Sequence, residues 1–215
     1  LFRPVSDWSG TTAPTVAFGQ GYSVTAMQAT SVFATIANDG VRVSPTVIAG
    51  TTDSSGKYTA AAGRTSERVV SAQTAQQLRI MMESVVSGQG TAPSAAIPGY
   101  RVAGKTGTAW KASAGGYSTN RYLAVFAGLA PASNPRVATV VVIDEPSAGL
   151  YYGGDIAAPV FSSVVGGALR LLAVAPDMPL DDYSDQMPES TPAPVDLAPG
   201  MIPTTIAQTA DGLRR

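Results

Sequence analysis

Apolar residues recur at helical spacing in two segments of the first half of the chain. The first segment follows Ser23 and Thr25, either of which can cap a helix, and ends at Gly40, where a left-handed C-cap residue belongs. The second segment starts at Ser71, a good N-cap, and ends at Gly88. We therefore predict two amphipathic helices, whose apolar stripes contain Met27, Val32, Phe33, Ile36 and Ala37 in the first and Leu78, Met81, Met82, Val85 and Val86 in the second.

The segments around these helices lack this periodicity. Residues 1–22 contain several prolines and glycines and are predicted to be irregular. The β-branched run at residues 41–48 predicts a strand. Residues 51–63 are rich in Ser, Thr and Gly, which predicts a loop, and a second loop is predicted over residues 87–99.

Three runs that are typical of strands follow, at residues 100–110, 122–129 and 137–143. The connections between them are short, which predicts that the strands are antiparallel neighbours. A last apolar helix follows, with Asp155 at its positive end and Pro159 in its first turn. The predicted fold class is therefore α+β, an α/β/α sandwich in which helices flank an antiparallel sheet.

The character of the chain changes after residue 176, where prolines recur among acidic residues and threonines. We predict that residues 1–176 belong to one domain and that residues 177–215 form a disordered, Pro-rich tail. The most apolar long stretch, residues 160–174, is too short and too interrupted to span a bilayer. We therefore expect any membrane anchor to lie in a segment before Leu1.

Composition excludes several classes of function. Charged residues make up 13% of the chain and the formal net charge is −1, which argues against a nucleic-acid partner because nucleic acid requires a clustered basic surface. The chain contains no cysteine and no histidine, so a Ser-His-Asp triad and Cys-based metal sites are impossible. We therefore expect neither a metal nor a cofactor, and any catalytic base must be Lys, Tyr or a carboxylate.

One short segment carries candidate chemistry, the sequence Ala-Gly-Lys-Thr-Gly-Thr-Ala at residues 103–109. In a strand, Thr106 and Thr108 share one face and Lys105 lies on the other. Gly107 lets an extended peptide lie against the strand and pair with its backbone. The two hydroxyl groups and the ammonium group suit a carboxylate or a developing oxyanion.

The sequence around this motif resembles class B penicillin-binding proteins of the cell-division type. In this family Lys-Thr-Gly is the third active-site element, after Ser-x-x-Lys and Ser-x-Asn. The resemblance covers residues 15–176 and is carried by "AFGQGYSVTAMQATSVFATIANDGVRVSPTVI", "GYRVAGKTGTAW", "YLAVFAGLAP", "PRVATVVVIDEPS" and "YYGGDIAAPVFSSVVGGALRLL". It implies the penicillin-binding transpeptidase and β-lactamase-like fold, incomplete in this chain.

The resemblance also implies a function, that of a peptidoglycan D,D-transpeptidase. In this family a serine attacks the D-Ala-D-Ala amide of one stem peptide, an amine of a second stem peptide resolves the acyl-enzyme, and β-lactams trap it. Carried onto this chain, Lys105 is expected to orient and charge the site, and the N–H of Thr108 to stabilise the oxyanion. The expected substrate-binding residues are Thr106, Gly107, Thr108, Tyr122, Tyr151 and Tyr152.

Two side-chain pairs have a second interpretation. Tyr151 and Tyr152 either line the site or anchor the last helix in the core. Asp144 and Glu145 form a carboxylate pair that suggests acid–base chemistry, although a charged strand end before Pro146 is the favoured interpretation.

The nucleophile that the resemblance implies is not recognised in these residues. The one Ser-x-x-Lys string, residues 54–57, falls in a predicted loop and not at the start of a helix. A Ser-x-Asn string, residues 118–120, follows Lys-Thr-Gly instead of preceding it and falls between two predicted strands. We interpret both as coincidental, and expect this chain to supply the substrate-binding strand and to be inactive without a segment that supplies the serine.

Two other functions stay open at this point. One is a D,D-carboxypeptidase or β-lactamase-like hydrolase, and the other is a non-catalytic penicillin-binding sensor or structural module. For the transpeptidase, the expected partners are peptidoglycan stem peptides, β-lactams as inhibitors and septal cell-division proteins. The expected location is the periplasmic face of the bacterial inner membrane.

Overall fold

The structure, a computed structural model, describes residues 4–17, 19, 21–113, 116–147 and 149–179. Its centre is an antiparallel sheet in the order β5–β6–β7, formed by β5 (Ala103–Ser113), β6 (Gly116–Ala130) and β7 (Val137–Asp144). The pairing of β5 with β6 runs without interruption from Ala103 opposite Leu129 to Trp110 opposite Tyr122. The three predicted strands and their antiparallel order are confirmed, although β6 begins six residues before its predicted start because the hairpin extends beyond Tyr122.

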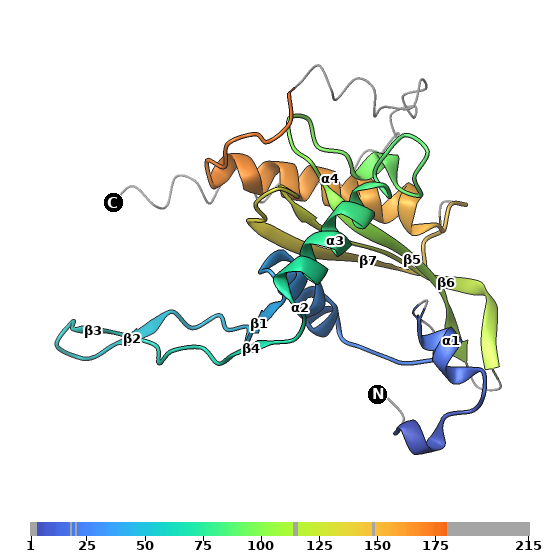
Figure 1. Cartoon of the computed structure of the whole chain (residues 1–215), viewed down its shortest axis with the longest axis horizontal. Helices are drawn as coiled ribbons and strands as arrows, with labels where there is room; N and C mark the ends of the chain where they lie inside the picture. Colours follow the sequence, from blue (N-terminus) through green and yellow to red (C-terminus); the bar gives the residue numbers. More distant parts are fainter. Residues whose placement is uncertain (1–3, 18, 20, 114–115, 148, 180–215) are drawn as a thin grey trace.

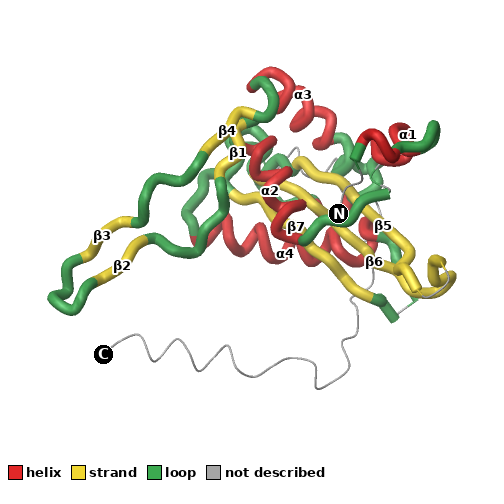
Figure 2. Tube along the Cα trace, turned by 90° about the horizontal axis from the view of Figure 1, so that it is seen from below, coloured by secondary structure: helices red, strands yellow, loops and turns green. Residues whose placement is uncertain are grey.

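Helices cover both faces of this sheet (Figure 1). One face contacts α2 (Ala26–Ala37) and α3 (Ala72–Glu83), and the other contacts α4 (Gly153–Leu171). Figure 2, seen from below, shows α2 in front of the sheet and α4 behind it. The three layers confirm the predicted α/β/α arrangement.

Alternate residues of the strands point into two separate cores. On the α4 side, the fully buried rings of Phe126 and Phe161 meet edge to face with centroids 4.9 Å apart. On the opposite side, Ala103 and Leu129 are fully buried beside Met82 of α3. Between Ala103 and Trp110, the odd-numbered side chains of β5 therefore lie on the face of α2 and α3, and the even-numbered ones lie on the face of α4.

The predicted starts of α2 and α3 are confirmed. Thr25 caps α2 in a capping box, since its side chain accepts from the N–H of Gln28 and the Gln28 side chain accepts from the N–H of Thr25. Ser71 caps α3 by accepting from the N–H of Thr74 at 3.0 Å. Gly40 has a φ of +82° after α2, as predicted.

The end of α3 was predicted too late. The helix ends at Glu83 and not at Gly88. The N–H groups of Val85 and Val86 bond to the carbonyls three residues earlier, so the backbone tightens into turns after Glu83.

Three other predictions for the first half were wrong in part. Residues 1–22 contain a short 3₁₀ turn, η1 (Val5–Asp7), and a short helix, α1 (Thr12–Ala17). The strand predicted over residues 41–48 is only β1 (Val41–Val43), because Pro45 lacks the N–H that a longer ladder would need. The strand β1 pairs with β4 (Ser66–Arg68).

The loop predicted over residues 51–63 is a β-hairpin, in which β2 (Gly50–Thr52) pairs with β3 (Tyr58–Ala60). Asp53 holds its turn by accepting from the N–H groups of Ser55 and Lys57. Residues 41–68 together form a projection, which we call the arm and which extends away from the sheet (Figure 1).

The last helix begins one turn earlier than predicted. It starts at Gly153, so Pro159 is its seventh residue and lies beyond the first turn. Pro159 lies on the exposed side of α4, so the carbonyl of Asp155, which the proline leaves without an N–H donor, is accessible to solvent. Asp155 does lie in the first turn, as predicted.

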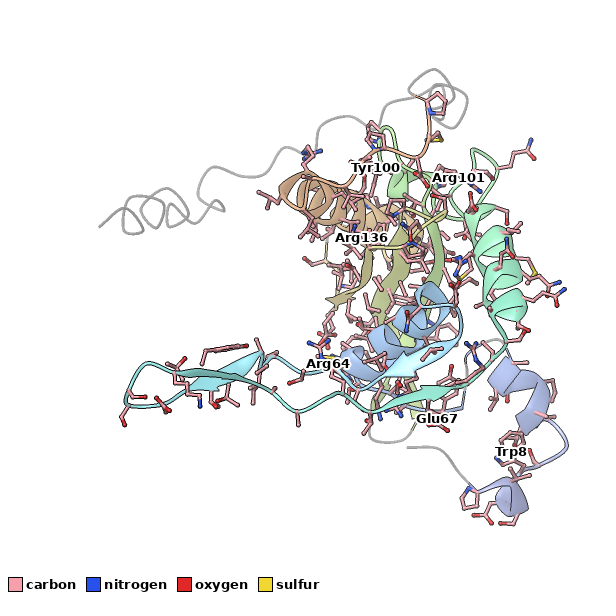
Figure 3. The ribbon with its side chains drawn as sticks, turned by 60° about the vertical axis from the view of Figure 1, so that its left-hand side comes forward. Trp8, Arg64, Glu67, Tyr100, Arg101 and Arg136 are labelled. Carbon is pink, nitrogen blue, oxygen red and sulfur yellow. The ribbon has the colours of Figure 1, made fainter. Side chains whose placement is uncertain are left out.

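The C-terminal segment after α4 folds back onto the body. The hydroxyl of Tyr100 donates to the carbonyl of Val174 at 2.6 Å, and the N–H groups of Asp177 and Met178 both bond to the carbonyl of Gly99. Figure 3 shows Tyr100 and Arg101 at this end of the molecule, distant from Arg64 and Glu67 on the arm. Contacts with the body therefore continue two residues past the predicted boundary at residue 176.

The rest of the predicted tail, residues 180–215, lies outside the described residues. Within the described part of the chain, no helix combines the length and the hydropathy that a membrane span requires.

Candidate active site

Strand β5 is at one edge of the described sheet, and its backbone groups alternate between β6 and the open edge. The N–H of Glu145 donates to the carbonyl of Tyr122 at 2.9 Å, so the backbone groups of Tyr122 point toward β7 and not toward Trp110. Because bonded and unbonded pairs alternate in an antiparallel ladder, Thr108, opposite Ala124, is also unbonded to β6. The N–H of Thr108 therefore points to the open edge.

A second contact agrees with this alternation. The Nζ of Lys105 reaches the carbonyl oxygen of Thr106 at 3.1 Å, which it approaches from outside the ladder. Thr106 and Thr108 therefore have their backbone groups at the same open edge, as a strand that receives a peptide requires.

The side chains of the motif lie on the two faces that strand geometry predicted. Thr106 is opposite Phe126, whose ring packs against α4, so the hydroxyl groups of Thr106 and Thr108 lie on the α4 face. Lys105 is opposite Ala127 and lies on the face that α2 and α3 cover.

Two elements from outside the motif contact its threonines. The N–H of Gly153, at the start of α4, donates to the Oγ1 of Thr108 at 3.2 Å. The Oγ1 atoms of Thr91 and Thr106 are 3.1 Å apart, and either oxygen can donate. The two hydroxyl groups are thus held by a loop and by the start of a helix.

Two glycines near the motif have different roles. A Cβ on Gly153 would lie 2.2 Å from the carbonyl oxygen of Val125 and 2.7 Å from that of Gly107, so the close approach of α4 to the sheet requires glycine there. A Cβ on Gly107 would meet only the Cβ of Val125, at 3.5 Å. Packing within the described residues does not require Gly107, whose small size leaves this face of the strand clear.

A cleft of about 790 Å³ begins at Thr108 and follows the distal half of β5. This volume is within the range of small-molecule sites. Of the predicted site residues, Thr108, Tyr122, Tyr151 and Tyr152 line the cleft, whereas Lys105, Thr106 and Gly107 lie on the strand just before it. The remaining lining residues are Gly19, Gly21, Tyr22, Ser23, Ala109, Trp110, Lys111 and Leu123.

One wall of the cleft is aromatic. The rings of Tyr122 and Tyr151 stack with centroids 4.2 Å apart and 14° between their planes, and Tyr152 continues the row at 4.4 Å. The hydroxyl of Tyr151 donates to that of Tyr152, which favours the protonated phenol and raises the pKa of Tyr151. Because Tyr152 is 56% exposed, the pair lines the cleft and does not anchor α4 in the core.

The carboxylates of Asp144 and Glu145 hold a lysine. The Nζ of Lys111 lies 2.8 Å from Asp144 Oδ1 and 2.8 Å from Glu145 Oε1, and Arg121 adds a longer contact of 3.4 Å to Glu145. The hydrogen bond to Asp144, followed by that to Glu145, raises the pKa of Lys111, and the hydrogen bond from Lys111 lowers the pKa of Glu145. The pair is a charged strand end, the interpretation that the sequence favoured, and it ties β7 to β5.

Of the two short strings, the Ser-x-x-Lys string lies outside the cleft. Residues 54–57 form the turn between β2 and β3, at the end of the arm. Residues 118–120 lie within β6, so the prediction that they connect two strands was wrong. A smaller cavity of about 350 Å³ between α2, α3 and the arm has a mostly apolar lining and includes none of the predicted site residues.

Sequence reasoning missed several residues that build the site. Thr91 precedes Thr106 by fifteen residues in a segment predicted only as a loop. Trp110 and Lys111 lie at the irregularity in the β5–β6 pairing, where the register shifts between Trp110 and Ala112. Gly153-Gly154 carried a usable signal, since two consecutive glycines at a helix start indicate a close approach. No cluster of three metal-ligating side chains occurs in the part of the chain that the structure describes.

Comparison with known proteins places the chain in a family. The penicillin binding protein transpeptidase domain matches residues 4–166. Penicillin-binding protein PbpB of Mycobacterium tuberculosis is 42% identical over 179 residues, which are 79% of this chain and 26% of the relative. Peptidoglycan D,D-transpeptidase FtsI of Escherichia coli is 42% identical over 184 residues, which are 82% of this chain and 28% of the relative.

Solved structures show the same relationship. The apo transpeptidase domain of Burkholderia pseudomallei penicillin-binding protein 3 matches with a TM-score of 0.71 and 42% identity, over 83% of this chain and 52% of that structure. Penicillin-binding protein 3 of Mycobacterium tuberculosis in complex with aztreonam matches with a TM-score of 0.76 and 40% identity, over 84% of this chain and 42% of that structure.

The chain belongs to the penicillin-binding protein transpeptidase domain family, and its relatives are class B enzymes, as the sequence predicted. It spans about a quarter of the length of PbpB and of FtsI. The fold class is confirmed with the family.

Proposed function

We propose that this chain is part of a peptidoglycan D,D-transpeptidase and that it supplies the substrate-binding strand. The observation that carries the proposal is the open edge of β5, where the outward N–H of Thr108 lies beside the hydroxyl groups of Thr106 and Thr108. An extended stem peptide would pair with this edge. The names of the relatives, which include peptidoglycan D,D-transpeptidases, support the same reaction.

Each group of the motif has a proposed role in acyl transfer. The hydroxyl groups of Thr106 and Thr108 bind the terminal carboxylate of the stem peptide, and Lys105 supplies positive charge to the site. The outward N–H of Thr108 donates to the carbonyl oxygen as it gains negative charge, which typically contributes about 10²–10³ in rate. Gly107 leaves the strand face clear for the ligand, and Tyr122, Tyr151 and Tyr152 form the cleft wall that it contacts.

The serine nucleophile is proposed to come from a segment outside these 215 residues. The one Ser-x-x-Lys string lies in the turn of the arm, and its Ser55 and Lys57 N–H groups are occupied by Asp53. In the whole protein, we propose β-lactams as inhibitors, septal cell-division proteins as partners, and action at the periplasmic face of the inner membrane. The relative from Mycobacterium tuberculosis that was solved with aztreonam and ampicillin supports the inhibitor class.

The test is covalent labelling of the full-length protein with a fluorescent penicillin. The label is expected on a serine outside residues 1–215, located by mass spectrometry of the labelled peptide. Thr108→Val should abolish acylation or slow it by about 10- to 100-fold, because it removes a hydrogen bond to a charged group, and should leave the fold intact. Thr59→Val on the arm is the matched control, since Thr59 is exposed and distant from the cleft.

Two of the alternative functions have their own outcome in this experiment. A folded protein that takes up no label would indicate a non-catalytic module. Rapid turnover of the penicillin would indicate a β-lactamase-like hydrolase. A label on Ser54, or unchanged acylation of Thr108→Val, would contradict the roles proposed for the serine and for Thr108.

A further inference from the structure

The hydroxyl groups of Thr106 and Thr108 each have a hydrogen-bond partner within the described residues. Thr108 Oγ1 is 3.2 Å from the backbone nitrogen of Gly153. Thr106 Oγ1 is 3.1 Å from Thr91 Oγ1. Both partners lie outside the Lys-Thr-Gly-Thr motif and come from different elements of the fold.

For Thr108, the direction of the hydrogen bond is determined by its partner. A backbone N–H only donates, so the hydroxyl oxygen of Thr108 must accept. A threonine hydroxyl has one proton and two lone pairs, and this contact uses a lone pair. The proton of Thr108 is therefore free to point into the cleft, and the first turn of α4, the positive end of a 19-residue helix, favours that arrangement.

The position of Thr91 is fixed by its surroundings. The next residue, Ala92, is fully buried, and its N–H donates to the carbonyl of Val85 at 2.9 Å. A Cβ on Gly154 would lie 2.1 Å from the carbonyl oxygen of Thr91, so the backbones of the loop and of α4 are in direct contact. Thr91 is thus held between the start of α4 and β5, with its hydroxyl at Thr106.

We propose that Thr91 is a positioning residue, which donates to the hydroxyl of Thr106 as Gly153 donates to that of Thr108. Both threonines of β5 then present a proton to the same anion. Two donors match a carboxylate, which only accepts hydrogen bonds, whereas a hydroxyl that donated backward to Thr91 would present lone pairs to it. This inference rests on the proposed function, because the carboxylate is that of the stem peptide or the penicillin.

The test measures acylation of the full-length protein by a fluorescent penicillin as a function of penicillin concentration. Thr91→Val keeps the shape and removes the hydroxyl, so the concentration for half-maximal acylation should rise about threefold to tenfold, the equivalent of one lost hydrogen bond. The limiting rate should change less than about twofold, because the hydroxyl acts on binding of the anion. Thr91→Ser restores the hydroxyl and should restore the wild-type value.

Two further arms separate positioning from a general packing role. A penicillin whose carboxyl group is a methyl ester carries no anion. It should therefore acylate the wild type and Thr91→Val at the same slow rate. Thr91→Ala is measured in parallel, because it removes the hydroxyl without adding the second γ-methyl group that valine brings. A loss shared by both variants is then due to the missing hydroxyl and not to the added methyl group. Thr59→Val on the arm should behave as wild type with both compounds.

The outcomes distinguish this inference from the proposed function. A wild-type protein that takes up no label contradicts the proposed function and this inference with it. If the wild type is labelled and Thr91→Val is labelled at the same concentrations, only the role of Thr91 is wrong. The positioning role is also wrong if Thr91→Val is acylated less readily than wild type by the methyl ester, to the same extent as by the free acid. It is wrong as well if Thr91→Ser does not restore the wild-type value.

Discussion

The arm and the β5–β6 hairpin are both antiparallel, but they differ in what supports them. The arm consists of strands of three residues, and its β3 and β4 residues are all exposed. The β5–β6 hairpin is longer and has helices on both faces, with Ala103, Phe126 and Leu129 fully buried. The edge of β5, unlike the β2–β3 end of the arm, is held in a fixed position relative to a cleft.

The difference shows what turns a strand edge into a binding site. An exposed ladder changes shape easily, because few buried contacts oppose local opening. In β5, the cores on the two faces and the contacts of α4 and Thr91 hold the threonine hydroxyl groups within a few ångströms of the open edge. Removal of each support should therefore have an effect that reflects how much of the hairpin it holds.

The largest effect is expected from the core that supports the hairpin. Phe161→Ala removes a fully buried ring that packs edge to face on Phe126. It should lower the free energy of unfolding by about 3–5 kcal/mol, measured by urea unfolding. A loss below about 1 kcal/mol would mean that α4 does not hold the sheet as described.

A smaller effect is expected where α4 meets the loop of Thr91. Gly154→Ala places a Cβ against the backbone of Thr91 and should cost about 1–3 kcal/mol of stability and slow acylation of the full-length protein. Gly167→Ala, in the same helix, has open space around its Cβ and should be neutral or stabilising by up to about 1 kcal/mol. Equal behaviour of the two variants in unfolding and labelling assays would contradict the close contact.

The charged end of the hairpin is expected to depend on pH. The pKa of Glu145 is lowered from its ordinary 4.5, chiefly by its hydrogen bond from Lys111. Its contribution to the free energy of unfolding is therefore present above about pH 4.5 and is lost as pH falls through the folded-state pKa. The pKa of Lys111 is raised from 10.5, chiefly by Asp144, so its contribution is present below about pH 10.5 and is lost as pH rises through its folded-state pKa.

Lys111→Met removes both contributions. The difference in urea midpoint between wild type and this variant should be largest near neutral pH and should shrink between about pH 6 and about pH 3 as Glu145 becomes protonated. Val142→Ala, on the same strand as Asp144, is the control. Valine has no titrating group, so the effect of this change on the urea midpoint should not depend on pH. A wild-type minus Lys111→Met difference that is the same at both pH values would contradict the role of the ion pairs.

The smallest effect is expected on the arm. Val47 is 99% exposed, so Val47→Ala should change the free energy of unfolding by less than about 0.5 kcal/mol and leave penicillin labelling unchanged. Urea unfolding and labelling check both points. A loss of labelling would show that the arm takes part in the site, and the contrast with β5 would be wrong.

The sequence was sufficient for the parts of the fold that local patterns determine. Caps at Thr25 and Ser71, the three long strands and the faces of Thr106 and Thr108 follow from side-chain chemistry and from the strand period. The β2–β3 hairpin was missed because its Ser, Thr and Gly residues have no apolar face, so no alternation marks it.

The parts of the site that depend on contacts between distant segments were not predictable in the same way. Thr91 and Gly153 reach β5 from two directions, and no spacing in the sequence indicates that these segments converge. Lys111 was missed for the same reason, since its partners Asp144 and Glu145 are more than thirty residues away. Motifs identified the strand, and tertiary structure was needed to show what orients it.

The most direct test of this account is a crystal structure of the full-length protein acylated by a penicillin. We expect the ligand along the open edge of β5, with its carboxylate about 3 Å from the Oγ1 atoms of both Thr106 and Thr108 and its carbonyl oxygen at the N–H of Thr108. A ligand bound elsewhere, or another strand of the protein paired along that edge, would contradict the assignment of β5 as the substrate-binding strand.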